Sequence, residues 1–267
     1  MFWEEIFQFQ DSQDIRLVKS NNEKKQNTSK FKQLQFNRIL LKISGEVLAG
    51  NNSFGINPES TFQIAKKIKT LYDKNIEIGI VVGGGNIFRG ISVSAKGMDR
   101  VAADYLGMMA TIMNSVALQS ELEKLGCNTR VMSALSITQL AEPYIRRKAT
   151  RHLEKKRIVI FAGGTGNPYF TTDTAAVLRG IEINANIIIK GTKVDGVYSC
   201  DPIKFDNAIK YDKLSFKEAI DKELKVMDLT AFTLCKENNL PIAVLNIKNE
   251  RSLIDLIENK KIGTIIC

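Results

Sequence analysis

Short apolar runs alternate with amphipathic stretches along most of the chain. The apolar runs predict β-strands at 38–43, 77–82, 129–132, 158–162, 187–190, 242–245 and 264–266. Apolar residues at helical spacing between them predict helices at 58–71, 99–125, 143–156, 175–182, 216–224, 229–237 and 251–258. Strands that alternate with helices are typical of an α/β fold in which helices cover both faces of a mainly parallel sheet.

Glycine-containing loops follow four of the predicted strands, at 44–46, 83–90, 163–174 and 191–202. A glycine loop lets backbone N–H groups approach an anion, and a helix N-terminus behind the loop favours negative charge. Ligands of open α/β sheets bind outside the carboxyl ends of the strands. The loops therefore predict a phosphate-binding site at that edge of the sheet.

The first 36 residues differ in composition from the rest. Up to Val18 they contain four acidic residues and one basic residue, and from Lys19 to Lys32 they contain five lysines and one glutamate. Such a segment cannot bury much apolar surface, so residues 1–36 are predicted to form a flexible leader. Residues 37–267 are predicted to form a single catalytic domain. No run approaches the roughly 18 apolar residues of a membrane span, which predicts a soluble protein.

The formal net charge of +9 over 267 residues suits either polyanions or phosphorylated small molecules. The four cysteines are widely spaced, which indicates reduced thiols in the cytoplasm rather than disulfides or a zinc site. The only histidine, His152, lies in a strongly basic stretch and is interpreted as part of a solvated helix face. Any general acid or base must then be a carboxylate, lysine, tyrosine or cysteine.

Four charged residues accompany the glycine loops and are the candidate catalytic residues: Lys42, Arg89, Asp173 and Asp201. Phosphoryl transfer brings two anions together. It therefore requires cations and backbone amides to offset their repulsion, and carboxylates to hold Mg²⁺ or orient a lysine. A phosphate oxygen is already a nucleophile, so a phosphate acceptor needs no general base. The Walker motif is absent, which argues against a Walker-type kinase. The third glycine of a dinucleotide fingerprint is also absent, which argues against an NAD-dependent oxidoreductase.

Five segments in order resemble the bacterial UMP kinases of the amino-acid kinase superfamily: 42–46 (KISGE), 83–90 (GGGNIFRG), 165–172 (TGNPYFTT), 193–198 (KVDGVY) and 225–228 (KVMD). The likeness runs from about Arg38 to Ile266. It implies a three-layer αβα sandwich around a mainly parallel twisted sheet, a homohexamer, and transfer of a phosphoryl group from ATP to UMP. The products would be ADP and UDP, in pyrimidine nucleotide biosynthesis. Mg²⁺ would be carried by ATP, with no protein ligand directly assigned.

The resemblance also implies roles for individual residues. ATP would be bound by Lys42, Ile43, Ser44, Gly45, Gly85, Arg89, Thr192, Tyr198 and Asp201. UMP would be bound by Gly84, Asp104, Thr165, Gly166, Asn167, Pro168, Tyr169, Phe170, Thr171 and Thr172. GTP activation would involve Gly50, Asn51, Asn52, Ser53, Phe54 and Gly55, and UTP would inhibit. Asn186 departs from the family pattern, because many relatives have an acidic residue there.

Structural alternatives stay open for the carboxylates. Asp104 is the only carboxylate in an apolar helical run, where it could bond a neighbouring cation or backbone amide instead of ribose hydroxyls. Asp173 and Asp228 could serve as helix caps.

Two other functions also stay open. One is a superfamily kinase that phosphorylates a carboxylate substrate. The other is nucleic-acid binding through the basic stretch 146–157. That stretch lacks interleaved aromatic residues, so neither nucleic acid nor a membrane is expected as a required partner.

Overall fold

The computed structural model describes residues 36–89, 97–202, 204–205, 207–224 and 226–267. The predicted leader lies outside these residues except for Phe36, which packs against the hydrophobic core. Gly90 and Lys225 of the motifs quoted above also lie outside them.

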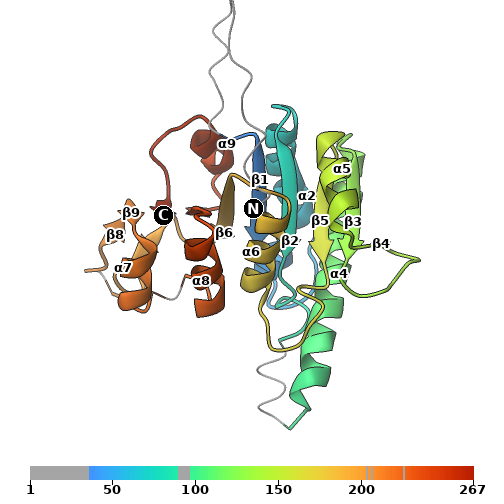
Figure 1. Ribbon diagram of the computed structural model, residues 1–267, viewed down its shortest axis with the longest axis horizontal. Coiled ribbons are helices and arrows are strands. Elements are labelled where there is room, and N and C mark those ends of the chain that lie inside the picture. The colour runs from blue at the N-terminus through green and yellow to red at the C-terminus, as the bar shows by residue number, and fades with distance from the viewer. Residues whose placement is uncertain (1–35, 90–96, 203, 206, 225) are drawn as a thin grey trace, which may run out of the picture. The chain divides into compact units, whose positions relative to one another are not determined.

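The strands are β1 (Arg38–Ile43), β2 (Glu77–Val82), β3 (Thr129–Ser133), β4 (Glu142–Pro143), β5 (Ile158–Ala162), β6 (Ile187–Thr192), β7 (Val197–Tyr198), β8 (Lys210–Tyr211), β9 (Lys213–Leu214), β10 (Ile242–Asn246) and β11 (Thr264–Ile266). Within the described residues, nine of them form one sheet in the order β4-β3-β5-β2-β1-β6-β10-β11-β9 (Figure 1). Only the β10–β11 pair in this sheet is antiparallel. β7 and β8 form a separate antiparallel hairpin.

Each strand predicted from the apolar runs is present, with ends that differ by no more than two residues. The strands β4, β7, β8 and β9 were not predicted. Each contains only two residues, too few for an alternating pattern to be visible. They exist because a neighbouring segment offers backbone partners.

The helices are α1 (Gly45–Ala49), α2 (Pro58–Tyr72), α4 (Arg100–Lys124), α5 (Arg146–Glu154), α6 (Thr172–Glu182), α7 (Phe216–Asp221), α8 (Leu229–Glu237) and α9 (Ser252–Ile257). α2 begins as predicted, because the Asn57 side chain accepts a hydrogen bond from the Ser60 N–H and Pro58 occupies the first turn. α5 begins at Arg146 rather than Pro143, since Glu142–Pro143 pair with β3. α1 was not predicted, and its first residues belong to the first glycine loop.

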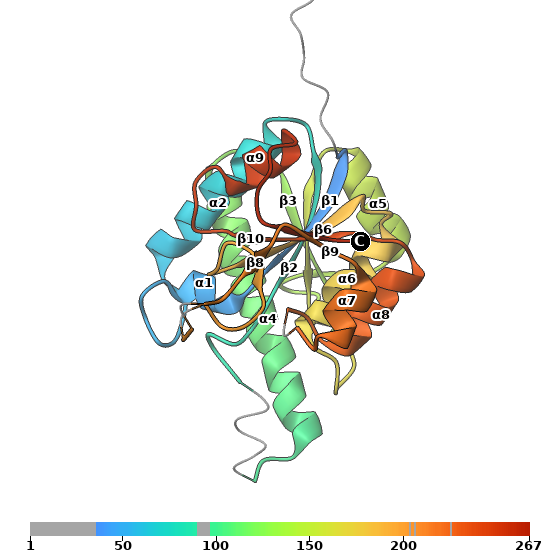
Figure 2. The same cartoon turned by 90° about the vertical axis from the view of Figure 1, so that its left-hand side faces the viewer.

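Helices cover both faces of the large sheet, which confirms the three-layer α/β fold. Figure 2 shows α1, α2, α4 and α9 on one side of the strands and α5, α6, α7 and α8 on the other. Alternate residues of each strand enter separate hydrophobic clusters. In β1, Ile39, Leu41 and Ile43 join the cluster with α2 and α4, whereas Leu40 joins the cluster with α6 and α8.

α4 is the one described helix that is long and apolar enough to cross a membrane by length and composition. This differs from the expectation that no stretch would approach such a span. Ile112, Leu118 and Leu122 of α4 are buried in the core, and α4 packs against α2. This part of α4 therefore belongs to the hydrophobic core.

Two polar residues have structural roles. The Asn186 Oδ1 atom accepts hydrogen bonds from the backbone N–H groups of Asn37 and Arg38 at 3.0 and 2.9 Å, and so fixes the start of β1. The interpretation of His152 as a solvated residue is wrong. Its side chain is 13% exposed and lies 3.2 Å from Glu142 and 3.0 Å from Arg157. This ring joins β4 to α5.

Candidate active site

The predicted phosphate loops meet at one edge of the sheet. β5, β2, β1 and β6 are adjacent and parallel, so their carboxyl ends lie side by side. The loops at 44–46, 83–89, 163–171 and 193–196 leave these four strands. Four segments that are distant in the sequence therefore surround one site.

Close backbone packing explains two of the glycines. A Cβ atom on Gly45 would lie 2.5 Å from the Gly83 carbonyl oxygen, and one on Gly84 would lie 2.7 Å from the Gly107 carbonyl oxygen. The first loop thus packs directly on the second, and the second packs on α4. A side chain at Gly45 would force the two loops apart, and one at Gly84 would push the second loop away from α4.

A buried ion cluster lies at this edge. Lys42 of β1 and Lys190 of β6 are paired in register, and their Nζ atoms each lie 2.6 Å from one carboxylate oxygen of Asp173. Lys190 also donates to the Val226 carbonyl. Burial alone would raise the pKa of Asp173, but the two ammonium groups hold it below its ordinary value. Burial, with Lys42 nearby, lowers the pKa of Lys190 despite the attraction of Asp173.

Asp173 stands in the first turn of α6 but does not cap it. The cap is Thr171, whose hydroxyl oxygen accepts hydrogen bonds from the Asp173 and Thr174 N–H groups at 3.0 and 3.4 Å. The same hydroxyl donates to Asp228, which also accepts from the Ala231 N–H at 2.8 Å and caps α8. The capping alternative therefore holds for Asp228 and not for Asp173, and Asp228 links the starts of two helices.

A second ion cluster lies beside the first and is exposed. The Glu46 carboxylate, in the first turn of α1, lies 2.6 Å from Arg89 Nη2 and 2.8 Å from Lys193 Nζ. The hydrogen bond from Lys193 lowers the pKa of Glu46. Arg89, predicted to bind a phosphate, is thus paired with a carboxylate in the helix that follows the neighbouring strand β1.

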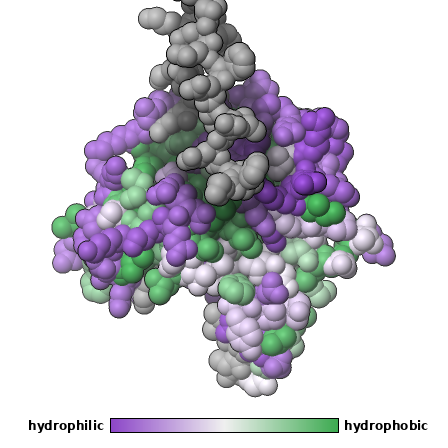
Figure 3. Space-filling model, viewed as in Figure 1, coloured by the Kyte–Doolittle hydropathy of each residue, from purple (hydrophilic) through white to green (hydrophobic). Residues whose placement is uncertain are grey.

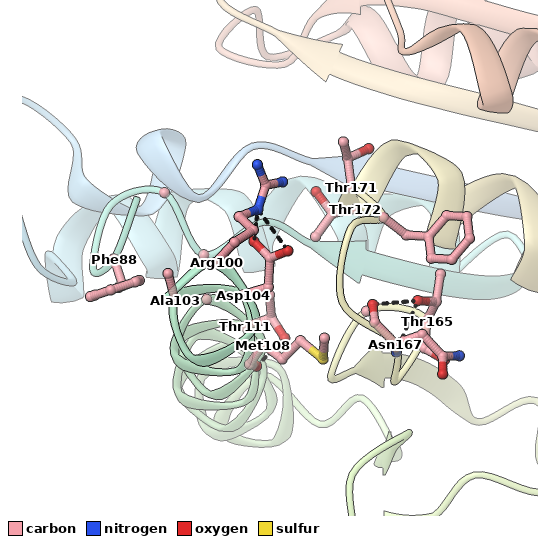
Figure 4. A pocket seen from close by; sticks show the side chains of 15 residues that line it. Phe88, Arg100, Ala103, Asp104, Met108, Thr111, Thr165, Asn167, Thr171 and Thr172 are labelled. Atoms are coloured by element: carbon pink, nitrogen blue, oxygen red, sulfur yellow. Dashed lines mark hydrogen bonds and ion pairs between the residues drawn. The ribbon is translucent and has the colours of Figure 1, made fainter. Parts of the chain in front are cut away.

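A cleft of about 220 Å³ opens next to the buried cluster, between α4 and the loop that precedes α6 (Figure 4). Seven residues predicted to bind UMP line it: Gly84, Asp104, Thr165, Asn167, Phe170, Thr171 and Thr172. Gly85, assigned to ATP, lines it too. Residues that were not predicted also line it: Phe88, Arg100, Ala103, Gly107, Met108, Thr111 and Gly164.

The remaining predicted UMP residues shape the loop instead of lining the cleft. Gly166 has a positive φ of 83° and packs on Ala134, and Pro168 follows it. Tyr169 also has a positive φ, of 71°, and its ring is largely exposed. The Tyr169 N–H donates to Asp104 Oδ2 at 2.8 Å. Asp104 therefore has the backbone partner that its structural alternative requires, and it has Arg100 as well.

The predicted donor-side residues are more dispersed. The Thr192 hydroxyl ends β6 and donates to the Val194 carbonyl at 2.6 Å. The Tyr198 hydroxyl donates to Asp195 at 2.5 Å within the hairpin region. Asp201 lies after β7, and its carboxylate is 3.8 Å from Lys204. The three residues lie along the segment that connects β6 to β8.

Comparison with known proteins gives the family. Residues 37–246 match the amino acid kinase family. The chain belongs to the amino acid kinase family.

Three solved structures are similar to this kinase. UMP kinase from Bacillus anthracis shares 38% identity with a TM-score of 0.84, over 86% of this chain and 96% of that one. UMP kinase from Ureaplasma parvum shares 41% identity with a TM-score of 0.81, over 86% and 98%. Uridylate kinase from Archaeoglobus fulgidus shares 27% identity with a TM-score of 0.67, over 86% and 99%. Within its family, the chain is of the bacterial UMP kinase type.

Sequence reasoning assigned no role to four charged residues of the site in this kinase: Lys190, Arg100, Glu46 and Lys193. Glu46 and Lys193 lie within motifs quoted above. Lys190 gave a weak signal, because it is a lysine directly after three isoleucines in a buried strand. Arg100 gave a signal only through its spacing of four residues from Asp104 on one helix. A buried amide pair, Asn86 and Asn114, gave none. It exchanges hydrogen bonds of 3.0 and 2.7 Å and holds the second glycine loop on α4.

Proposed function

We propose that this protein transfers the γ-phosphoryl group of MgATP to UMP and gives ADP and UDP for pyrimidine nucleotide synthesis. An oxygen of the UMP phosphate forms the new bond to the γ-phosphorus, and the bond from that phosphorus to the β–γ bridging oxygen breaks. The observation that carries the proposal is the buried cluster of Lys42, Asp173 and Lys190 beside a cleft that contains Asp104.

The buried cluster would offset the charge of the two phosphates. Asp173 holds both ammonium groups within 2.6 Å, so their positions are set before substrate arrives. Fixed charges in a site that excludes water stabilise a transition state without reorganisation. The N-terminus of α6 adds a partial positive charge at the same edge. Proton transfer by a general base is not needed, because the attacking oxygen is already anionic.

Mg²⁺ would enter with the nucleotide. Within the described ranges, no group of three or more His, Cys, Asp or Glu side chains could hold a metal ion. Asp173 is already held by two lysines, whereas Asp201 lies on the exposed hairpin side. Mg²⁺ would therefore be held mainly by the phosphates of ATP, and it would reduce their negative charge.

The decisive experiment is a coupled assay of ADP formation with MgATP and a panel of acceptors: UMP, CMP, AMP, aspartate and acetylglutamate. UMP should be the preferred acceptor by a wide margin. Preference for aspartate or acetylglutamate would identify a carboxylate kinase instead. A salt-sensitive gel shift with the whole chain would reveal nucleic-acid binding by the basic helix α5.

Self-association is part of the proposal. Tyr105, Leu106, Met109 and Met113 expose 39 to 55% of their surface along one side of α4. This end of α4 projects beyond the sheet, and Figure 3 shows a mixed surface there, with a few hydrophobic patches among more polar residues. A soluble protein rarely leaves such a row uncovered. We propose a homohexamer in which α4 contributes contacts, and light scattering of the eluted protein measures its mass.

Regulation by nucleotides is the remaining part. The segment 50–55 is tied to the second glycine loop, because Gly55 and Asn86 exchange hydrogen bonds of 2.8 Å. GTP bound near this segment would thus affect the position of the second glycine loop, which contains two residues predicted to bind ATP. We propose GTP as an activator. UTP shares the uridine and phosphate of the acceptor, and we propose it as an inhibitor. Initial rates with each nucleotide test both effects.

The four cysteines are free thiols, which suits the cytoplasm as the site of action.

A further inference from the structure

Arg100 and Asp104 form a charged pair inside the cleft. The Arg100 Nε atom lies 3.0 Å from Asp104 Oδ1 and 2.9 Å from Oδ2, one helical turn apart on α4. The guanidinium carbon also lies 5.8 Å from the centre of the Tyr169 ring. Arg100 is therefore held by its Nε side and by an aromatic face, and neither contact uses the far end of the guanidinium.

The far end of Arg100 faces the cleft. In Figure 4 its terminal nitrogens point away from Asp104, and Thr171 and Thr172 lie across from them. Within the described part of the chain, Nη1 and Nη2 have no hydrogen-bond partner. Two parallel N–H donors on one side of a guanidinium match two oxygens of a phosphate.

The charges that line the cleft also favour a phosphate beside Arg100. Among the described residues that line it, Arg100 is the one cation and Asp104 the one anion. A nucleoside monophosphate brings roughly two negative charges, as other phosphate monoesters do at neutral pH. Without Arg100, Asp104 would be the one charged side chain left among the described residues that line the cleft, and it would repel the phosphate. Arg89, the arginine predicted for phosphate binding, is paired with Glu46 and does not line the cleft.

We propose that Arg100 is a specificity-determining residue that binds the phosphate of the acceptor. This inference rests on the proposed function and adds to it a division of labour within one ion pair. Asp104 accepts hydrogen bonds from the ribose hydroxyls, while Arg100 donates to the phosphate through Nη1 and Nη2. The pair makes the cleft select a nucleotide over the corresponding nucleoside.

The test compares two ligands, UMP and uridine, in the full-length protein. Dissociation constants are measured by calorimetry for the wild type, Arg100→Gln and Arg100→Lys. Arg100→Gln should weaken UMP roughly 10- to 100-fold, the usual loss for a charged hydrogen bond, and should change uridine less than about threefold. Arg100→Lys should restore part of the UMP affinity, because it keeps the charge without the paired donors.

Arg251→Gln is the matched control. Arg251 and Asp255 form the same kind of arginine–aspartate pair, four residues apart at the start of α9 and away from the cleft. This variant should bind both ligands as the wild type does. Thermal melting of each variant, followed by circular dichroism, identifies any loss of fold.

Equal weakening of UMP and uridine by Arg100→Gln would overturn the inference, because it would show that Arg100 only positions Asp104. Unchanged UMP affinity would overturn it as well. If uridine binds too weakly to titrate, the ³¹P chemical shift of bound UMP decides. A contact between the guanidinium and the phosphate should change this shift in Arg100→Gln, and an unchanged shift would overturn the inference. Failure of the wild type to bind UMP would instead reject the proposed function.

Discussion

Two ion clusters at the same edge of the sheet have the same plan and different surroundings. Each places one carboxylate between two cations: Asp173 between Lys42 and Lys190, and Glu46 between Arg89 and Lys193. The side chains of the first cluster are 10 to 15% exposed, and those of the second are 39 to 59% exposed.

The difference in burial separates two roles. Charges removed from water attract each other strongly, and breaking such a group leaves a buried charge unpaired. Exposed charges are screened by water and salt, and their pairing contributes little. The buried cluster can therefore act as a fixed part of the site. The exposed cluster can exchange its carboxylate for a ligand phosphate without much loss of stability.

The largest effect is expected from Asp173→Asn, which removes the carboxylate of the buried cluster. Two neighbouring ammonium groups would then lack their counterion, at a loss of about 3–5 kcal/mol in the free energy of unfolding. Turnover should fall by more than the loss of a single cation causes, because both lysines are released. Urea unfolding and the coupled ADP assay measure the two effects. A stable, active Asp173→Asn enzyme would contradict the assignment.

The same variant tests the pH dependence of stability. The folded-state pKa of Asp173 lies below its ordinary value of 3.8, so its contribution is fully present above that value. The contribution is lost as the pH falls through the folded-state pKa. Wild type should therefore lose stability relative to Asp173→Asn as the pH falls below the ordinary carboxylate value of 3.8. Parallel unfolding curves for the two proteins in this pH range would show that Asp173 is not stabilised as an anion.

Lys42→Ala should lower turnover about a hundredfold, equivalent to about 3 kcal/mol of transition-state stabilisation. Arg89→Ala should lower it less, because Arg89 belongs to the exposed cluster and is paired in the free protein. Steady-state rates at saturating ATP and UMP measure both. Equal losses of turnover in the two variants would show that the buried and exposed clusters do not differ in their catalytic roles. Near-normal turnover in both variants would reject a role of either residue in catalysis.

Asp104→Asn should raise the Michaelis constant for UMP roughly 10- to 100-fold and leave that for ATP nearly unchanged. The wild type should also prefer UMP to dUMP, since a site built for a hydroxyl is left with an unpaired group by the analogue that lacks it. Kinetics with the two acceptors measure this preference. If UMP and dUMP serve equally well, Asp104 does not bind the ribose.

The smallest effect is expected from Glu46→Gln. Releasing Arg89 and Lys193 should lower the Michaelis constant for ATP by only a few-fold, and salt should reduce the difference. Stability should change by no more than about 0.5 kcal/mol. Glu59→Gln, in the first turn of α2, is the control for losing one first-turn glutamate. A large loss of stability in Glu46→Gln would show that the exposed cluster is structural.

Local patterns in the sequence determined the strands, most helices and the glycine loops. Apolar runs placed β1, β2, β5 and β11 at their observed residues. These features depend on residues close together in the chain, through side-chain periodicity, capping and glycine conformations. The candidate residues Lys42, Asp104 and Asp173 could be identified for the same reason. Each is a charged residue within an apolar strand, within an apolar helical run or at the end of a glycine loop.

Only the tertiary structure decided which charges meet. The β1–β6 register places Lys42 beside Lys190, and the packing of α6 on β1 and β6 brings Asp173 to both lysines. The pairing of Glu46 with Arg89 and Lys193 follows from the order β2-β1-β6. Neither can be seen in sequence spacing, because strand order is set by burial of whole faces of the sheet. Burial also decides which of two similar ion clusters is fixed and which is exchangeable. That property depends on how much water the surrounding helices and loops exclude.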